Sequence, residues 1–291
     1  MLNPKTKIEV FDNLKDLQTA CATRKYTFEK YCPEQYRISR AESDTRKEFT
    51  GVRTYAEADE MLTGGMSADV TRDLTPAPAS FRGTHLRRRN VNGVCGGVVN
   101  IGRALTGAPD CWEARRKVPT RARVINFIVN TAVHYGVSVA EITAAQKVVL
   151  EYIAALEARG IRCNIYAAAI IADKWQKHER NADMSRKYFG VVAKIKDAGE
   201  RLNVAKVAYP LTHPAYLRRH AFAWLETVPG GAKFSNKYTG QCYGLATQPD
   251  RATMQELLPQ IRDAVYIHAE AIYDDAADAI KKYIDKQINE K

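Results

Sequence analysis

The feature that most constrains this chain is a strand–helix–strand pattern over residues 120–173. Two apolar runs, residues 124–129 and 161–171, flank a long amphipathic run, and neither alternates regularly between apolar and polar residues. Such runs are typical of strands that are covered on both faces, as in parallel sheets. The run between them is long enough for the crossover helix that parallel neighbours need. The pattern predicts a βαβ unit, although the alanine-rich residues 166–173 are also compatible with a helix.

The amphipathic run carries its own start and stop signals. Ser138 and Glu141 have the spacing of a capping box, in which each side chain bonds the other residue's backbone N–H. Apolar residues then recur at three- and four-residue steps, which places them on one helical face. Gly160 follows, and glycine favours the left-handed conformation that ends many helices. A helix is therefore predicted between the two strands.

These elements predict an α/β fold. We expect a Rossmann-like or von Willebrand A-like layered sheet with helices on both faces, occupying residues 118–291 as the core domain. Residues 187–196 and 265–268 read as further strands of this sheet. In such folds ligands bind just past the carboxyl ends of the strands, so we expect a crevice there.

The remaining part, residues 1–117, is expected to be an N-terminal extension that packs on the core. It contains a predicted helix over residues 54–63, because Thr54 and Glu57 repeat the capping-box spacing. Residues 1–49 show no clear periodicity and are interpreted as a peripheral arm. A Gly- and Arg-rich loop completes the extension.

Positive charge is concentrated in residues 82–123. This stretch holds ten basic and two acidic residues, a net charge of +8, whereas the whole chain has +11. Arginine makes bidentate contacts to phosphate and stacks on bases, so its clustering favours a patch that binds a polyanion. The alternative is a charged loop that acidic surface elsewhere neutralises. The predicted nucleic-acid-binding residues, whose two basic runs we expect on one face, are Arg87, Arg88, Arg89, Arg103, Arg115, Arg116 and Lys117.

The glycines of residues 92–109 invite comparison with phosphate-binding loops. The comparison fails, because no G-K-[ST] ends the segment and its glycines do not form G-x-G-x-x-G. The segment also precedes the βαβ unit instead of lying inside it. We therefore predict a tight irregular loop.

Established catalytic and metal-binding motifs are absent from the sequence. A von Willebrand A-type metal site needs D-x-S-x-S after the first strand, but residues 130–134 read Asn-Thr-Ala-Val-His. There is no G-x-S-x-G, no H-E-x-x-H and, among six cysteines, no C-x-x-C pair. We accordingly predict no catalytic residues, no metal and no cofactor.

One group of side chains could still hold an anion. His213 precedes a predicted helix that begins near Pro214, and Arg218 and Arg219 follow on the face opposite the apolar one. A helix N-terminus beside arginines favours anions. An enzyme built on this group would also need a strand-end carboxylate, Asp173 or Asp197, in the same crevice. The alternative is that His213 caps the helix and the arginines form a solvated face.

No apolar run approaches the roughly 20 residues of a membrane span. The first residues also lack the apolar segment of a signal peptide. We therefore expect a cytoplasmic protein with no membrane partner, and the sequence does not point to any particular protein partner.

Several segments carry a resemblance to a known family. They include Phe49-Thr-Gly-Val-Arg-Thr-Tyr-Ala-Glu-Ala, residues 94–109, the βαβ unit with Leu156-Glu-Ala-Arg-Gly160, and Leu211-Thr-His-Pro-Ala-Tyr-Leu-Arg-Arg. Together they cover most of residues 49–229 and resemble uncharacterised proteins of tailed bacteriophages and prophages. The resemblance implies a phage origin, a host-cell cytoplasmic location and a domain of unknown function. The family carries no established catalytic residues, so none is transferred.

The sequence thus leads to one expectation and two alternatives. We expect a phage-encoded accessory protein, non-enzymatic, that binds nucleic acid or another polyanion through the Arg-rich patch. One alternative is an enzyme that acts on a phosphate-bearing ligand in the strand-end crevice. The other is a virion or assembly component.

Overall fold

The computed structural model describes most of the chain. The described residues are 6–25, 39–40, 47–67, 86–119, 124–134, 136–158, 160–172, 188–228, 245–246, 249–268, 282 and 284–286.

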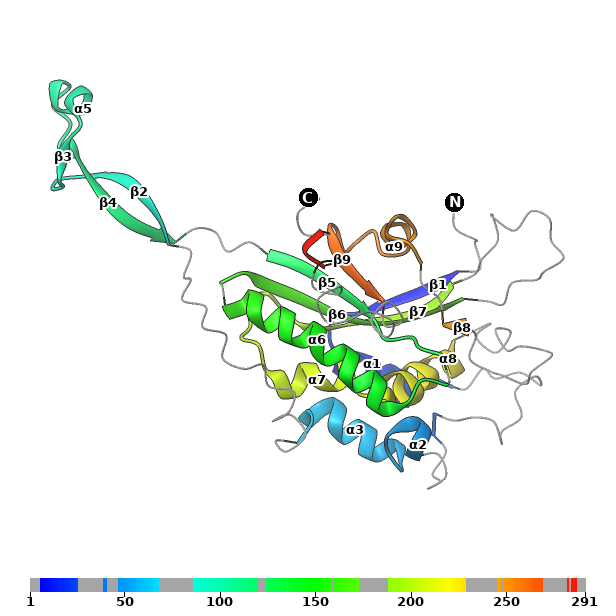
Figure 1. Cartoon of the computed structure of the whole chain (residues 1–291). Coiled ribbons are helices and arrows are strands. Elements are labelled where there is room, and N and C mark those ends of the chain that lie inside the picture. The colour runs from blue at the N-terminus through cyan, green and yellow to red at the C-terminus, as the bar shows by residue number, and fades with distance from the viewer. Residues whose placement is uncertain are drawn as a thin grey trace.

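A six-stranded mixed sheet organises these residues (Figure 1). Its strand order is β1-β7-β6-β5-β9, and β8 pairs with β6 outside this path. The strands are β1 (Lys7–Phe11), β5 (Val124–Asn130), β6 (Arg162–Ala172), β7 (Tyr188–Lys196), β8 (Leu245–Ala246) and β9 (Ala264–His268).

The βαβ unit predicted from the sequence is confirmed. Strands β5 and β6 are parallel neighbours, and α6 (Val139–Ala158) connects them. The capping box forms as expected, since Ser138 N donates to Glu141 Oε2 at 2.8 Å and Glu141 N donates to Ser138 Oγ at 3.2 Å. Strand β9 lies parallel to β5 on its other side. Arg162–Ala172 therefore forms a strand, and the helical alternative for its alanine-rich end is wrong.

The other half of the sheet runs in the opposite direction. Strand β7 is antiparallel to β6, and β1 is parallel to β7. Because Lys7–Phe11 is a strand of the central sheet, the interpretation of residues 1–49 as a peripheral arm is wrong for this segment. The sheet thus extends across the expected boundary at residue 117.

Helices cover both faces of the sheet, as expected for a Rossmann-like layered α/β fold. One face packs Phe127, Ile165 and Val191 against α6 and a group of shorter helices. The other face packs Ile128 and Ile170 against α9 (Arg251–Leu257). The shorter helices are α1 (Leu14–Thr23), α2 (Lys47–Thr50), α3 (Tyr55–Gly64), α7 (Val204–Thr212), the π-helix η3 (Tyr216–Ala221) and α8 (Phe222–Thr227).

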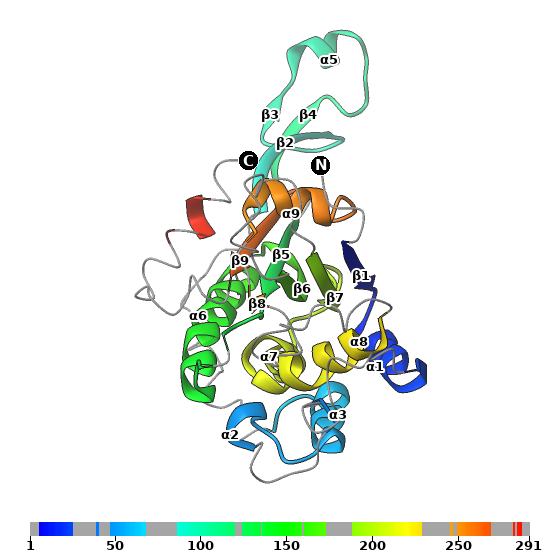
Figure 2. The same cartoon turned by 90° about the vertical axis from the view of Figure 1, so that its right-hand side faces the viewer.

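A second, three-stranded sheet extends away from this body. Its order is β2-β4-β3, and two views at right angles both show it projecting beyond the central sheet (Figures 1 and 2). We call residues 86–119 the arm. The expectation of an irregular loop over residues 92–109 is wrong for part of that stretch, because it contains strand and helix. The arm consists of β2 (Leu86–Gly93), β3 (Val98–Val99), α5 (Ile101–Leu105) and β4 (Trp112–Pro119).

Candidate functional site

The arm brings the two basic runs of the sequence side by side. Strands β2 and β4 are antiparallel, and their register pairs Arg88 with Lys117, Arg89 with Arg116 and Asn90 with Arg115. The runs therefore lie side by side on neighbouring strands of one ribbon. The expectation that they share a single face concerns side chains outside the described part of the structure. What remains is a two-stranded ribbon with like charges at directly opposed positions.

The two carboxylates of the arm are engaged near its far end. Asp110 accepts from Arg103 Nη2 at 2.6 Å, and this pair raises the pKa of Arg103 and lowers that of Asp110. Glu113 accepts from Asn100 Nδ2 at 2.7 Å and from Asn90 Nδ2 at 3.1 Å. Arg103, one of the predicted nucleic-acid contacts, is thus already part of an ion pair.

The charge of the arm follows from these pairings. Residues 86–119 contain seven basic and two acidic residues, a net charge of +5. Arg103 and Asp110 cancel, and Glu113 is held by two asparagines. The excess positive charge therefore comes from the runs 87–89 and 115–117, which lie nearer the base of the arm.

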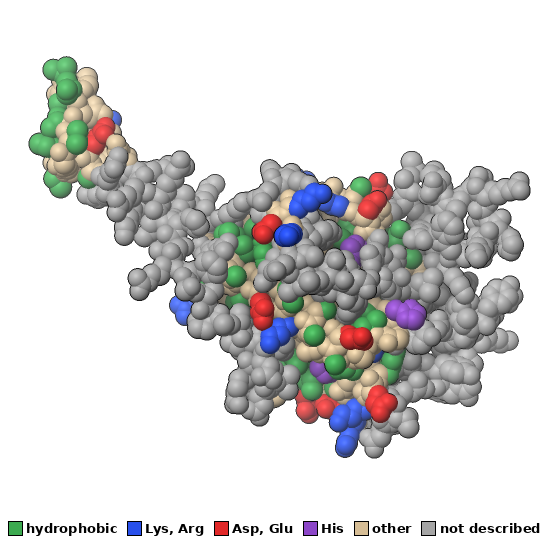
Figure 3. Space-filling model, viewed as in Figure 1, with side chains coloured by type: hydrophobic (Ala, Val, Ile, Leu, Met, Phe, Trp, Pro, Cys, Tyr) green, Lys and Arg blue, Asp and Glu red, His purple; other side chains and the backbone are tan. Residues whose placement is uncertain are grey.

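The sequence interpretation missed the apolar side chains at the end of the arm. Figure 3 shows hydrophobic side chains gathered over this end. Val94, Val98, Ile101 and Leu105 are all more than three-fifths exposed. The signal was present, since Ile101 and Leu105 stand four residues apart, a spacing that places both on one face of a helix.

The structure places Arg218 and Arg219 in the interior, so the expectation that they face solvent is wrong. Arg218 is 1% exposed and donates to the carbonyl oxygens of Phe49 and Val137. Arg219 is fully buried and donates to the carbonyl oxygens of Ser39, Val52 and Arg53 and to Thr50 Oγ1. These hydrogen bonds tie distant segments together, and they occupy the donors that an anion would need.

His213 is also a structural residue. It caps the C-terminus of α7, its ring stacks on Tyr209 with centroids 5.5 Å apart, and its Nδ1 accepts from Ala215 N at 3.2 Å. A Cβ at Gly51 would lie 2.7 Å from its ring, so this glycine leaves the space that the ring fills. Burial lowers the pKa of His213 to about 4, which keeps the ring neutral near pH 7. A neutral, enclosed imidazole adds no positive charge to an anion site.

The expected strand-end crevice does not assemble as predicted. Because β7 is antiparallel to β6, its final residue Lys196 and the following Asp197 lie at the amino edge of β5 and β6, opposite Asn130. Lys196 is buried there and forms an ion pair with Glu157 Oε1 at 2.7 Å. Asp173 lies outside the described residues. At the carboxyl edge, Asn130 Oδ1 accepts from Ile170 N at 3.0 Å, which makes it part of the sheet's own bonding.

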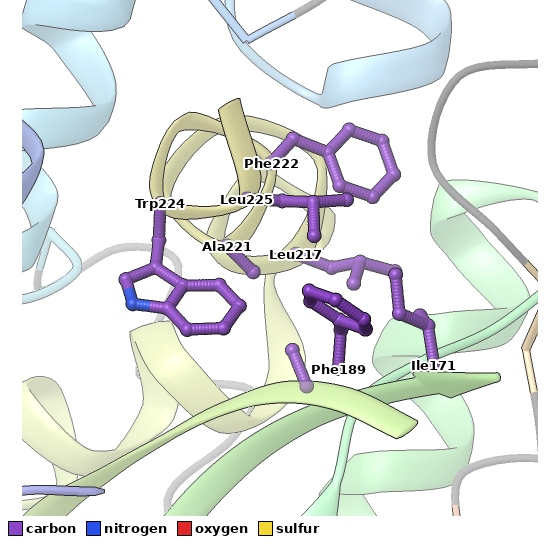
Figure 4. Close-up of a pocket in the computed structure, with 8 residues that line it drawn as sticks. Ile171, Phe189, Leu217, Ala221, Phe222, Trp224 and Leu225 are labelled. Carbon is purple, nitrogen blue, oxygen red and sulfur yellow. The ribbon is translucent and has the colours of Figure 1, made fainter. Parts of the chain in front are cut away.

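A pocket between β6, β7 and the η3–α8 helix is lined only by apolar and aromatic side chains (Figure 4). Ile171 and Phe189 come from the strands, and Leu217, Phe222 and Leu225 come from the helix. Its volume is about 10 Å³, room for about one water molecule. The pocket therefore offers no group for acid–base chemistry and no space for a phosphate-bearing ligand.

Within the described part of the chain, no three His, Cys, Asp or Glu side chains come together in a way that could hold a metal ion. No helix among the described residues is both long and apolar enough to cross a bilayer.

Comparison with known proteins gives one match. A family model described as a domain of unknown function (DUF7192) matches residues 2–289. No curated protein and no solved structure matches the chain.

Proposed function

The chain belongs to the DUF7192 family, a domain of unknown function. Since the family assigns no activity, we propose a function from the structure: the arm binds nucleic acid or another polyanion. The observation that supports this proposal most directly is the register of β2 and β4, which sets Arg88 opposite Lys117 and Arg89 opposite Arg116. Like charges directly opposite each other destabilise an antiparallel pair. A polyanion would remove that repulsion on binding.

The shape of the arm suits the same ligand. A two-stranded β-ribbon fits the major groove of duplex DNA, where phosphates line both walls. At the basic runs β2 and β4 form the two edges of the ribbon, so each run would then lie beside one phosphate strand. Both views show the arm projecting from the body (Figures 1 and 2).

The resemblance of residues 49–229 to phage proteins supplies the finer part of the proposal. We take the chain to be a phage or prophage accessory protein that acts in the host cytoplasm. In that role it would stay in the soluble fraction of an infected cell. Copurification with intact particles would instead support the alternative of a virion component.

The test removes the first basic run. The variant Arg87→Ala/Arg88→Ala/Arg89→Ala is expected to bind duplex DNA of mixed sequence more weakly than the wild-type chain. If each arginine contacts one phosphate, the slope of log K against log salt should fall by about 0.9 for each, roughly 2.7 in all. Fluorescence anisotropy over a series of salt concentrations measures both quantities, and the thermal melt should change little.

A matched control removes the same charge from the body. Lys15, Arg201 and Arg262 are exposed and lie outside the arm, so Lys15→Ala/Arg201→Ala/Arg262→Ala has the same net charge as the arm variant. It should keep a salt slope close to that of the wild type. Unaltered DNA binding by the arm variant, or equal losses in both variants, would refute the arm as the binding element.

A further inference from the structure

The end of the arm exposes a cluster of large apolar side chains. Seven large hydrophobic residues are exposed among those that the structure describes, and six of them lie here, with Leu105 at 84% and Val94 at 75%. The seventh, Val124, belongs to the central sheet. We call these six the apolar tip: Val94, Val98, Val99, Ile101, Leu105 and Trp112.

The apolar tip is held in place by polar contacts beneath it. Asn100 caps α5 by accepting from Arg103 N at 3.2 Å, and its amide donates to Glu113 at 2.7 Å. Gly96 packs so closely on β4 that a Cβ would lie 2.5 Å from Glu113 O. These contacts position the loop and α5, so the exposure of the apolar side chains is a feature of the folded arm. Exposed apolar side chains that gather at one place in this way mark an interaction surface (Figure 3).

We propose that the apolar tip binds the apolar tip of a second copy of this chain, which forms a two-fold symmetric dimer. The surface is the right size for such a contact. The exposed parts of its six residues amount to roughly 600 Å² per copy, so two copies reach about the 1,200 Å² at the lower end of the range for specific interfaces. A two-fold contact joins the same patch on both copies, so the patch needs no other complementary surface.

Strand β3 favours a protein partner over a lipid surface. β3 pairs only with β4 among the described strands, so within this part of the chain its outer edge offers backbone groups to a further strand. Hydrocarbon cannot hydrogen-bond an open sheet edge, which makes insertion into a bilayer costly. The β3 edge of a second copy can pair with it in antiparallel fashion, while Val98 and Val99 add apolar contact.

The charge distribution and the apolar pocket of the body support the same arrangement. Arg89 lies four residues from Gly93 at the far end of β2, roughly 13 Å at about 3.3 Å per residue. A tip-to-tip contact thus keeps the basic runs of the two copies apart. The pocket at Leu217 and Phe222 has a volume of about 10 Å³, too small to receive a leucine from another copy.

The proposal is tested on the full chain by sedimentation velocity over a wide range of concentrations. High salt and nuclease treatment remove any polyanion that could bridge two copies, so the result does not depend on the proposed nucleic-acid binding. The wild type is expected to shift from monomer to dimer as concentration rises. The variant Ile101→Asp/Leu105→Asp should raise the dimer dissociation constant at least about 100-fold, since two apolar side chains would no longer be buried.

The control is Val124→Asp, which introduces one negative charge, half of what the tip variant adds, on the exposed apolar residue outside the tip. It should dimerise as the wild type does, and thermal melts should show that both variants fold. A wild type that stays monomeric at every concentration overturns the proposal, and so does a dimer that the tip variant leaves intact. Tip-dependent binding of a monomeric chain to phosphatidylserine vesicles would overturn it in favour of a lipid surface.

Discussion

Replacing Arg219 with methionine is expected to lower the free energy of unfolding by roughly 3–5 kcal/mol. The Arg219 side chain is fully buried and donates to three backbone carbonyl oxygens at 3.0 to 3.2 Å and to Thr50 Oγ1 at 3.3 Å. Methionine has a similar length but no donor. The buried acceptors would lose their hydrogen bonds without gaining water. Urea denaturation at neutral pH measures the change.

Two further variants separate this effect from a general loss of charge. Arg219→Lys keeps a cation with three donors but not the planar guanidinium, so it should lower the free energy of unfolding by less than Arg219→Met does. Arg201→Met removes an exposed arginine and should change stability by less than about 0.5 kcal/mol. If Arg219→Met were as stable as Arg201→Met, residues 39–40 and 50–53 would not depend on this side chain for their attachment.

The sequence misplaced these arginines for a physical reason. A regular α-helix from Pro214 would set Arg218 and Arg219 opposite the apolar face. The segment instead forms the π-helix η3 (Tyr216–Ala221), whose i→i+5 bonding changes the angle between successive side chains. The backbone acceptors of Arg219 at Ser39 and Val52 lie more than 160 residues away in the sequence. No local pattern reports such partners, so burial of the pair could not be read from the sequence.

The βαβ unit could be predicted because its signals are local. Ser138 and Glu141 cap α6 within one turn, and the apolar runs of β5 and β6 identify two buried strands. The direction of β7, by contrast, has no local signal in the sequence. Its residues are as apolar as those of β6, and nothing in their order distinguishes a parallel from an antiparallel neighbour. The strand was therefore predicted, but Asp197 was assigned to the wrong edge of the sheet.

The arm was predictable in part. Its basic runs were evident from composition, but runs of consecutive charged residues carry no alternation from which strands could be predicted. Their pairing depends on a register that joins residues 27 to 29 positions apart, from Arg88 with Lys117 to Arg89 with Arg116. The sequence thus identified the residues of the candidate site, whereas their arrangement on a two-stranded ribbon came from the fold.

A second large effect is expected from two neutral, enclosed histidines. Burial lowers the pKa of His213 to about 4 against the opposing effect of Glu57, and burial also lowers the pKa of His268 to about 4. His268 Nε2 lies 2.8 Å from Pro249 O, so this nitrogen carries the proton and donates. Its Nδ1 is buried without a hydrogen-bond partner. Both rings are therefore neutral in the folded state near pH 7.

The sign of the pH dependence follows from these lowered values. An unfolded histidine has a pKa of about 6.5, so between pH 6.5 and 4 the unfolded chain binds protons that the folded chain does not. The stabilisation is complete above pH 6.5 and is lost as the pH falls toward 4. At pH 5 each histidine should lower the free energy of unfolding by about 2 kcal/mol relative to pH 7.5, and the pair should lower it by about 4 kcal/mol. Urea denaturation at pH 7.5 and at pH 5 measures the difference.

The matched variant keeps the hydrogen bonds and removes the titration. Asparagine at position 213 places Oδ1 where Nδ1 accepts from Ala215 N, and glutamine at position 268 places Nε2 where the ring donates to Pro249 O. Between pH 7.5 and pH 5, the free energy of unfolding of the double variant His213→Asn/His268→Gln should therefore fall by about 4 kcal/mol less than that of the wild type. Carboxylates that titrate in this range are present in both chains and cancel in the comparison. Equal pH dependence in the two chains would mean that the histidines become protonated in the folded state, which their enclosure by Gly51, Tyr209 and Tyr266 should prevent.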